Sequence, residues 1–225
     1  MERAVIFGGG DIDRDFALAF LNKKEFRYRI GADRGIRFMR EQGVRPTHIV
    51  GDFDSAGRED LEYFQRDGSI PIRAFQPEKD VTDAQIAVDL AIELGCGEIW
   101  MLGGMGCRAD HLLANIRLLG LALKKGAVCY LIDPWNKIRA ADSSLSLAEE
   151  EQFGRYVSLF ALGGQVTGLT LTGFKYPLSD YTMAGDDPLG VSNEIVAEKA
   201  KISFRSGVLI VAESRDHADH GERCR

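Results

Sequence analysis

Two aspartates separated by one phenylalanine are the residues in this sequence best placed to do chemistry. They lie in the stretch THIVGDFDSAG (47–57), an apolar strand-like run that stops abruptly at glycine. If the chain is still extended there, Asp52 and Asp54 project to one side and Phe53 to the other. Carboxylate oxygens on a rigid turn suit Mg²⁺, which takes one or two carboxylates together with waters and phosphate oxygens. A turn or cap aspartate is the alternative interpretation of either residue alone.

Similar runs of glycine and aspartate follow the other strand-like segments. The runs are GGGD (8–11), GADRG (31–35), KDVTD (79–83) and GGMGCRADH (103–111). The carboxyl ends of parallel strands share one edge of a sheet, where ligands bind. Glycine lets a ligand approach the backbone, and converging carboxylates repel one another unless a cation is present. The whole set therefore predicts a site for metal and phosphate, which Asp83 would join from the first turn of a helix.

The candidate phosphate ligands lie around GGMG (103–106), just before a helix that begins near residue 110. Backbone N–H groups at such a turn can hold phosphate, although a tight strand–helix turn needs no ligand. Arg108 could clamp phosphate bidentately or be an ordinary surface arginine. His111 could act as a base, but a capping or orienting role fits a helix start better. Lys79 could bind phosphate or pair with Asp80. No G-x-x-x-x-G-K-[ST] motif occurs, which excludes a P-loop.

The elements that must position these residues alternate between strand and helix over residues 4–133. Short apolar runs end in glycine, and amphipathic segments follow them. The clearest helix covers residues 82–95 and opens with a capping box at Thr82 and Gln85. This alternation predicts an α/β fold with a mostly parallel sheet and helices on both faces.

The pattern changes after Pro134. The remaining segments alternate every two residues between apolar and polar, with Gly and Ser turns and no convincing helix. They predict a small antiparallel β-sheet or sandwich. We place the boundary after residue 138. The first domain, residues 1–138, would be the nucleotide-binding α/β domain, and residues 139–225 the β-sandwich domain.

Composition limits the classes of protein that the chain can represent. The 225 residues carry a net charge of -6 and no Lys/Arg block, which argues against nucleic acid or an anionic membrane as partner. No apolar run reaches membrane-spanning length, and Met1-Glu2-Arg3 leads into AVIFGGG without a secretory signal. The four cysteines lack metal-type spacing, so we expect reduced thiols and a cytoplasmic location.

Five motifs, in this order and spacing, resemble the thiamine pyrophosphokinase (thiamine diphosphokinase) family. They are GDFDS (51–55), KDVTD (79–83), GGMGCRADHLLAN (103–115), TGFKYPL (172–178) and GVSNEI (190–195). The resemblance covers nearly the whole chain. It implies an N-terminal α/β nucleotide domain and a C-terminal β-sandwich, in a homodimer. It also implies Mg²⁺-dependent transfer of a pyrophosphoryl group from ATP to the hydroxyl of thiamine, giving thiamine diphosphate and AMP.

The resemblance implies roles for individual residues. Asp52, Asp54 and Asp83 would hold metal and phosphates, and Asp83 is the first candidate to orient the thiamine hydroxyl or accept its proton. The nucleotide site would be formed by Asp33, Lys79, Asp80, Thr82, Arg108, Asp110, His111 and Asn115. Ser192 and Asn193 would belong to a thiamine pocket at the subunit interface, whereas the residues alone indicate an ordinary polar turn.

Two residues depart from the family pattern, which has glycine at both positions. They are Cys107, before Arg108, and Arg34, after Asp33. Both add bulk where nucleotide should approach, so we expect altered affinity or nucleotide preference.

Three other functions stay open at this point. A related pyrophosphokinase could act on another alcohol, such as a hydroxymethyl pterin. A Mg²⁺-dependent phosphohydrolase could use the same aspartates and release phosphate without an acceptor. A nucleotide or thiamine sensor would bind these ligands without turnover.

Overall fold

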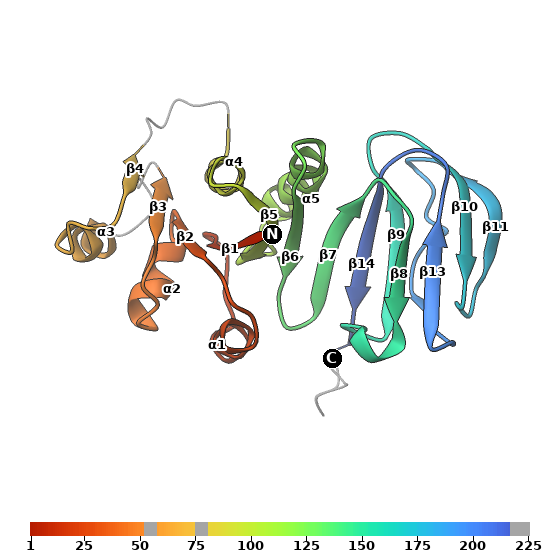
Figure 1. Ribbon diagram of the computed structural model, residues 1–225, viewed down its shortest axis with the longest axis horizontal. Helices are drawn as coiled ribbons and strands as arrows, with labels where there is room; N and C mark the ends of the chain where they lie inside the picture. The colour runs from red at the N-terminus through yellow and green to blue at the C-terminus, as the bar shows by residue number, and fades with distance from the viewer. Residues whose placement is uncertain (52–57, 75–80, 217–225) are drawn as a thin grey trace. The chain divides into compact units, whose positions relative to one another are not determined.

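The chain forms two compact units, Met1–Pro134 and Trp135–Arg225. The computed structural model describes residues 1–51, 58–74 and 81–216. Figure 1 shows that the α-helices of the described residues belong to the first unit, whereas the second is built mainly of strands. Within these described ranges, no helix is both long enough and apolar enough to cross a membrane.

The first unit is built on a sheet whose described strands are all parallel. Its strand order is β6-β5-β1-β2-β3-β4. The strands are β1 (Glu2–Phe7), β2 (Tyr28–Ala32), β3 (His48–Gly51), β4 (Ile72–Ala74), β5 (Cys96–Leu102) and β6 (Val128–Ile132). The central strand β1 is buried from Ala4 to Phe7, as expected for a parallel strand covered on both faces.

Helices cover both faces of this sheet. They are α1 (Arg14–Lys23), α2 (Gly35–Glu41), α3 (Arg58–Gln65), α4 (Asp83–Glu93) and α5 (Ala109–Lys124). Figure 1 shows α4 and α5 on one face and α1 and α2 on the other. Aromatic contacts attach the second pair: Phe38 stacks on Phe7, and Phe20 packs against Trp100. The predicted α/β architecture is confirmed.

Helix α4 begins and ends where the sequence indicates. The Gln85 backbone N–H donates to the Thr82 hydroxyl oxygen at 3.2 Å, so Thr82 is the N-cap. Gly95 follows the last turn with a φ of 82°, a left-handed conformation that suits glycine. The cap makes Asp83 the first residue of the helix, which fixes where its carboxylate leaves the backbone.

The second unit consists of two antiparallel sheets, with strand orders β12-β9-β14-β7 and β11-β10-β13-β8. The elements are β7 (Asn136–Ala141), β8 (Leu145–Ala148), η1 (Glu149–Glu151), β9 (Tyr156–Ala161), β10 (Val166–Thr172), β11 (Leu178–Met183), β12 (Asn193–Glu194), β13 (Lys199–Ser203) and β14 (Leu209–Ser214). One buried core joins the sheets, with Val157 and Leu209 from one and Leu169 and Ile202 from the other. This arrangement is the predicted β-sandwich.

Candidate active site

A pocket of about 470 Å³ opens at the carboxyl edge of the parallel sheet in the first unit. Its walls come from the loops after β1, β2 and β5 and from the first turns of α4 and α5. Of the residues predicted for the site, it is lined by Asp33, Thr82, Asp83, Arg108, His111 and Asn115. Strand exits that are far apart in the sequence thus meet at one place, because parallel strands end at the same edge.

Two glycine loops form the floor of this pocket and touch each other directly. The Gly8 and Gly10 N–H groups donate to the carbonyl oxygens of Leu102 and Gly103, at 2.8 and 3.0 Å. A Cβ on Gly10 would lie 2.5 Å from the Gly103 oxygen, closer than real Cβ atoms approach. Gly103 also has a φ of 71°. The floor is therefore backbone, which lets a ligand approach more closely than side chains would allow.

Asp33 stands beside this floor in an unusual backbone conformation. Its φ is 48°, in the left-handed region that aspartate tolerates better than most residues. Its N–H donates to the Val50 carbonyl at 3.1 Å, which ties the exit of β2 to β3. A Cβ on Gly9 would come within 3.0 Å of Asp33 Oδ2. The Asp33 carboxylate therefore lies over the glycine loop, where a ligand would rest.

Asp83 enters the pocket from the start of α4. The side chain is half-buried, and Thr82 lines the pocket beside it. A carboxylate in the first turn of a helix is stabilised by the positive end of the helix dipole. The Thr82 oxygen accepts a hydrogen bond from the Gln85 N–H, and its hydroxyl hydrogen can still donate to a ligand.

Arg108 and Asp110 form a fork-shaped pair at the rim. Arg108 Nη2 and Nε lie 2.6 and 3.2 Å from the two Asp110 carboxylate oxygens, and both residues are exposed. Asp110 Oδ1 also accepts the His111 N–H at 2.9 Å. These hydrogen bonds, that from Arg108 first, lower the pKa of Asp110 to about 2. In this structure Asp110 orients Arg108, and Arg108 is the group that can turn toward a phosphate.

Asn115 is a buried residue of the pocket wall. Its Nδ2 donates to the Gly104 carbonyl at 2.8 Å and so fixes the glycine run after β5. His111 lies further out, with an exposed side chain that lines the pocket. The structure thus gives Asn115 a positioning role and leaves His111 accessible to a ligand.

Four predicted site residues lie outside the described residues: Asp52, Asp54, Lys79 and Asp80. The described part of the chain contains no group of three or more His, Cys, Asp or Glu placed to hold a metal ion. The carboxylates that do line the pocket are Asp11, Asp33 and Asp83. Oxygen donors of this kind are compatible with Mg²⁺ in a site that phosphate and water complete.

The two residues that depart from the family pattern both line the pocket with exposed side chains. Arg34 has φ -60° and ψ -16°, a right-handed helical conformation that does not require glycine. Cys107 lies between the glycine run and Arg108. The added bulk therefore projects into the pocket and does not strain the backbone.

Sequence reasoning included Gly8, Gly9, Gly10 and Asp11 in the predicted set of strand exits but gave none of them an individual role, and all four line the pocket. The sequence feature that could have indicated a role in the site was their position directly after the first strand. That position alone does not distinguish a ligand-binding loop from a tight turn.

In the second unit, the two motifs that carry the family resemblance meet in one place. Asn193 is buried, and its Oδ1 accepts the Tyr176 and Glu194 N–H groups, each at 3.0 Å. Its Nδ2 donates to the Tyr176 carbonyl at 2.7 Å. Glu194 in turn pairs with Lys175 at 2.6 Å. Asn193 is therefore a clamp that joins residues 173–177 to strand β12.

Beside this clamp, Ser192 and Tyr176 are exposed. Ser192 has a φ of 57°, and its N–H donates to the Ser158 hydroxyl oxygen at 2.9 Å. Tyr176 leaves 60% of its surface exposed, unusually much for a large aromatic side chain. The sequence-based interpretation named Ser192 but gave Tyr176 no role. An accessible ring and an accessible hydroxyl on one surface could bind a heterocyclic ligand.

The chain is similar in sequence and in fold to thiamine pyrophosphokinases. The family model "Thiamin pyrophosphokinase, catalytic domain" matches residues 21–131, and "Thiamin pyrophosphokinase, vitamin B1 binding domain" matches residues 143–209. The thiamine pyrophosphokinase of Bacillus subtilis (strain 168) is 34% identical over 187 residues, which is 83% of this chain and 87% of the relative.

Crystal structures agree with the sequence matches. That of the thiamine pyrophosphokinase from Bacillus subtilis has a TM-score of 0.83 at 31% identity, covering 96% of this chain and 100% of the other. That of the Geobacillus thermodenitrificans protein has a TM-score of 0.82 at 30% identity, covering 97% and 99%.

The chain therefore belongs to the thiamine pyrophosphokinase family, as the motifs predict. Proteins of this family are enzymes, and this chain is one of them.

Proposed function

We propose that this enzyme transfers the pyrophosphoryl group of ATP to the hydroxyl of thiamine, forming thiamine diphosphate and AMP with Mg²⁺. One observation carries the proposal: Asp33, Asp83 and Arg108 come from three separate segments of the chain and line one backbone-floored pocket. Family membership supplies thiamine as the acceptor, and the pocket supplies groups suited to a polyphosphate donor.

The polyphosphate would lie along the glycine loops. Their backbone leaves room for close approach, and the N-termini of α4 and α5 add partial positive charge. Arg108 would grip phosphate oxygens from the rim, because a guanidinium pairs well with two oxygens. Its hydrogen bonds to the Asp110 carboxylate hold the Arg108 guanidinium in a fixed orientation before a ligand binds.

The residues that would hold Mg²⁺ are Asp52, Asp54 and Asp83. Bound there, the ion would neutralise charge that develops on the phosphate oxygens. Of the three, Asp83 lies in the described part of the chain, and it lines the pocket. Its place at a helix start favours the ionised carboxylate that such a role requires.

Asp83 is also the residue placed to orient the thiamine hydroxyl or accept its proton. Phosphoryl-type transfer demands little covalent chemistry from the protein, so in-line positioning and charge stabilisation dominate. Asp83 projects from a capped helix and not from a long loop, which limits its movement. The Thr82 hydroxyl beside it can donate to a phosphate oxygen.

For thiamine itself, we propose the surface formed by Ser192 and Tyr176. The match of residues 143–209 to a vitamin B1 binding domain supports this assignment. Asn193 would act indirectly, because all its described hydrogen bonds hold the surface together. As the motif resemblance implies, two chains would associate, with the thiamine site at their interface.

The test is a product analysis with thiamine, ATP and Mg²⁺ that resolves AMP from ADP. Thiamine-dependent AMP together with thiamine diphosphate is the expected result. ADP would indicate transfer of a single phosphoryl group and overturn the mechanism. Phosphate release without an acceptor would indicate a hydrolase, and turnover with a hydroxymethyl pterin would change the substrate. Binding without turnover would indicate a sensor.

A further inference from the structure

A second and larger groove lies at the opposite, amino-terminal edge of the same sheet. Its volume is about 920 Å³. The walls come from the start of β1, the end of α1 with the loop into β2, the start of β2, and the loop before β3. The two cavities share no lining residue, so the function proposed above does not involve this groove.

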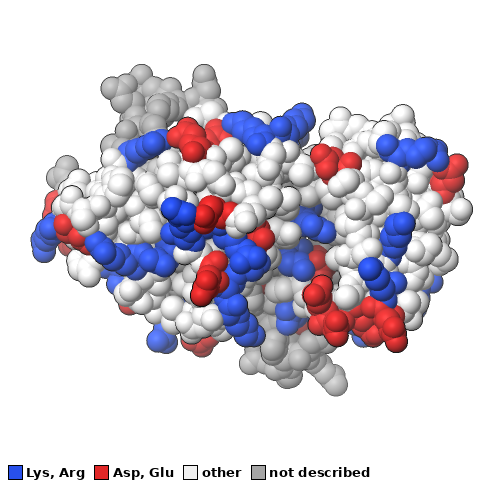
Figure 2. Space-filling view, in the orientation of Figure 1, with Lys and Arg blue, Asp and Glu red and all other residues white. Residues whose placement is uncertain are grey.

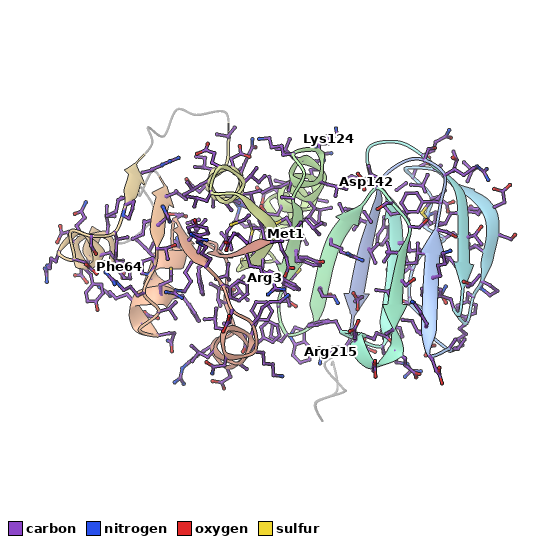
Figure 3. The ribbon with its side chains drawn as sticks, viewed as in Figure 1. Met1, Arg3, Phe64, Lys124, Asp142 and Arg215 are labelled. Carbon is purple, nitrogen blue, oxygen red and sulfur yellow. The ribbon has the colours of Figure 1, made fainter. Side chains whose placement is uncertain are left out.

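The groove is strongly basic, although the chain as a whole carries a net charge of -6. Its lining cations are Arg3, Lys23, Lys24, Arg27, Arg29 and Arg45. Figure 2 shows Lys and Arg side chains gathered near the centre of the visible face, with a few acids among them. Figure 3 labels Met1 and Arg3 at the start of β1, in the same area of the view.

Acidic neighbours neutralise only part of this charge. Glu98 is shared by two cations, with Oε1 at 3.2 Å from Arg3 Nε and 2.7 Å from Lys24 Nζ. The same oxygen accepts Trp100 Nε1–H at 2.6 Å. Two further ion pairs join Arg27 to Glu2 and Arg45 to Asp67. Six cations therefore face four carboxylates, those of Glu2, Glu25, Glu98 and Asp67.

Arg29 and Lys23 carry the remaining positive charge. Among the described residues, no carboxylate forms an ion pair with either side chain. Arg29 is half-buried, and its Nε donates to the Arg45 carbonyl at 2.9 Å, which holds the guanidinium at the groove. A partly buried cation without a counterion is unfavourable, so its position favours an anion from solution.

The other lining residues indicate what kind of anion fits. Leu21, Phe26 and Val44 give the groove apolar surface beside the cations. Its volume lies in the range of small-molecule sites and exceeds what inorganic phosphate fills. We propose that this groove binds an organic phosphate of nucleotide size with at least two negative charges, held by Lys23 and Arg29.

The proposal can be tested by calorimetric titration of ADP into the full chain in the presence of EDTA. We expect two ADP molecules per chain, one in each cavity. In the double variant Lys23→Ala/Arg29→Ala, one site should weaken at least about tenfold, the effect of losing charged hydrogen bonds, while the other is unchanged. The matched control is Arg66→Ala/Lys124→Ala, which removes two exposed cations that line neither cavity.

Two further variants separate this proposal from the function of the pocket. Arg108→Ala should weaken ADP binding in the pocket and leave binding in the groove unchanged. If the pocket binds no nucleotide at all, the groove site should still be detected, and it should still weaken when Lys23 and Arg29 are replaced. Lys23→Gln alone keeps an exposed polar side chain that cannot disturb the core. It should still weaken the groove site. If the double variant binds ADP as the wild type does, the groove is not a phosphate site.

Discussion

The two edges of the parallel sheet in the first unit differ in how they can recognise a ligand. At the carboxyl edge the walls are mainly glycine backbone and short acidic side chains, such as Asp33 and Asp83, with Arg34 and Arg108 as the lining cations among the described residues. At the amino edge they are long cationic side chains, such as Arg3 and Arg29. Helix dipoles explain part of the contrast, since helix N-termini lie at the first edge and helix C-termini at the second.

The contrast has a practical consequence for substitutions. At the carboxyl edge the shape of the backbone is essential, so adding a single methyl group should do harm. At the amino edge the cationic side chains form most of the polar surface, so the loss of charge should matter most. The variants below test the carboxyl edge, and the ADP titration above tests the amino edge.

The largest effect should come from Asp83→Asn. The amide keeps the shape of the side chain but cannot accept a proton or hold a cation as a carboxylate does. We expect kcat to fall about 10²- to 10⁴-fold, the range for loss of an acid–base group, with little change in ATP binding. Steady-state kinetics with AMP detection measures kcat, and calorimetric titration measures ATP binding.

The matched control for this variant is Asp89→Asn, on the same helix. Asp89 lies outside the pocket and pairs with Lys125 at 2.7 Å. Its replacement should leave kcat unchanged. Unchanged turnover in Asp83→Asn would remove Asp83 from the chemistry.

The next largest effect should be on stability, in Gly35→Ala. A Cβ at this position would lie 1.8 Å from the Phe7 carbonyl oxygen, so α2 must shift away from β1. We expect a loss of about 3 kcal/mol in the free energy of unfolding, the upper range for overpacking. Urea denaturation measures it. Gly164→Ala is the control, because nothing lies within 4 Å of a Cβ there. Equal midpoints for both variants would contradict the close contact.

A smaller effect should follow alkylation of Cys107 with iodoacetamide in a Cys224→Ser background. Cys107 is exposed in the pocket, whereas burial raises the pKa of Cys96 to about 11 and that of Cys129 to about 12. Their thiols are therefore protonated at neutral pH and should not react. We expect ATP binding to weaken about tenfold, because the added acetamide group would occupy part of the pocket surface. Peptide mass spectrometry locates the label.

Cys107→Ser in the same background is the control and should resist inactivation. ATP should protect Cys107 from the reagent. Full ATP binding by the labelled protein would show that this side chain does not border the nucleotide.

The smallest effect concerns the rim pair. In the wild type the hydrogen bonds from Arg108 and the His111 N–H hold the pKa of Asp110 at about 2. Folding lowers the pKa of Asp110, so the pair stabilises the folded protein at pH values above the pKa of the unfolded chain. This stabilisation is lost as the pH falls toward 2. In Arg108→Ala the pKa of Asp110 should rise toward its usual 3.8. Carbon-detected NMR titration of the Asp110 carboxyl measures this shift, and an unmoved titration would show that Arg108 does not hold the carboxylate.

Much of this architecture could be predicted from the sequence, because it depends on local patterns. Apolar runs that end in glycine predicted the parallel strands. The Thr82 and Gln85 pair predicted where α4 begins. The five family motifs predicted the family, since their order is hard to produce by chance. The position of the pocket followed from one general rule about strand ends.

The rest depends on contacts between distant residues, which no local pattern reveals. Nothing in the sequence indicates that the Asn115 amide reaches Gly104, or that Asn193 clamps Tyr176. The basic groove combines four cations from residues 23–29 with Arg3 and Arg45 from two distant segments. Only the folded sheet brings those segments to one edge.

Residues 34 and 35 will not change with equal ease over evolutionary time. Gly35 has no space for any side chain, whereas Arg34 is exposed at the pocket and sits in an ordinary helical conformation. Exchanges at residue 34 can therefore change the surface of the pocket at little cost to the backbone. The glycine beside it keeps the scaffold the same while the pocket surface varies.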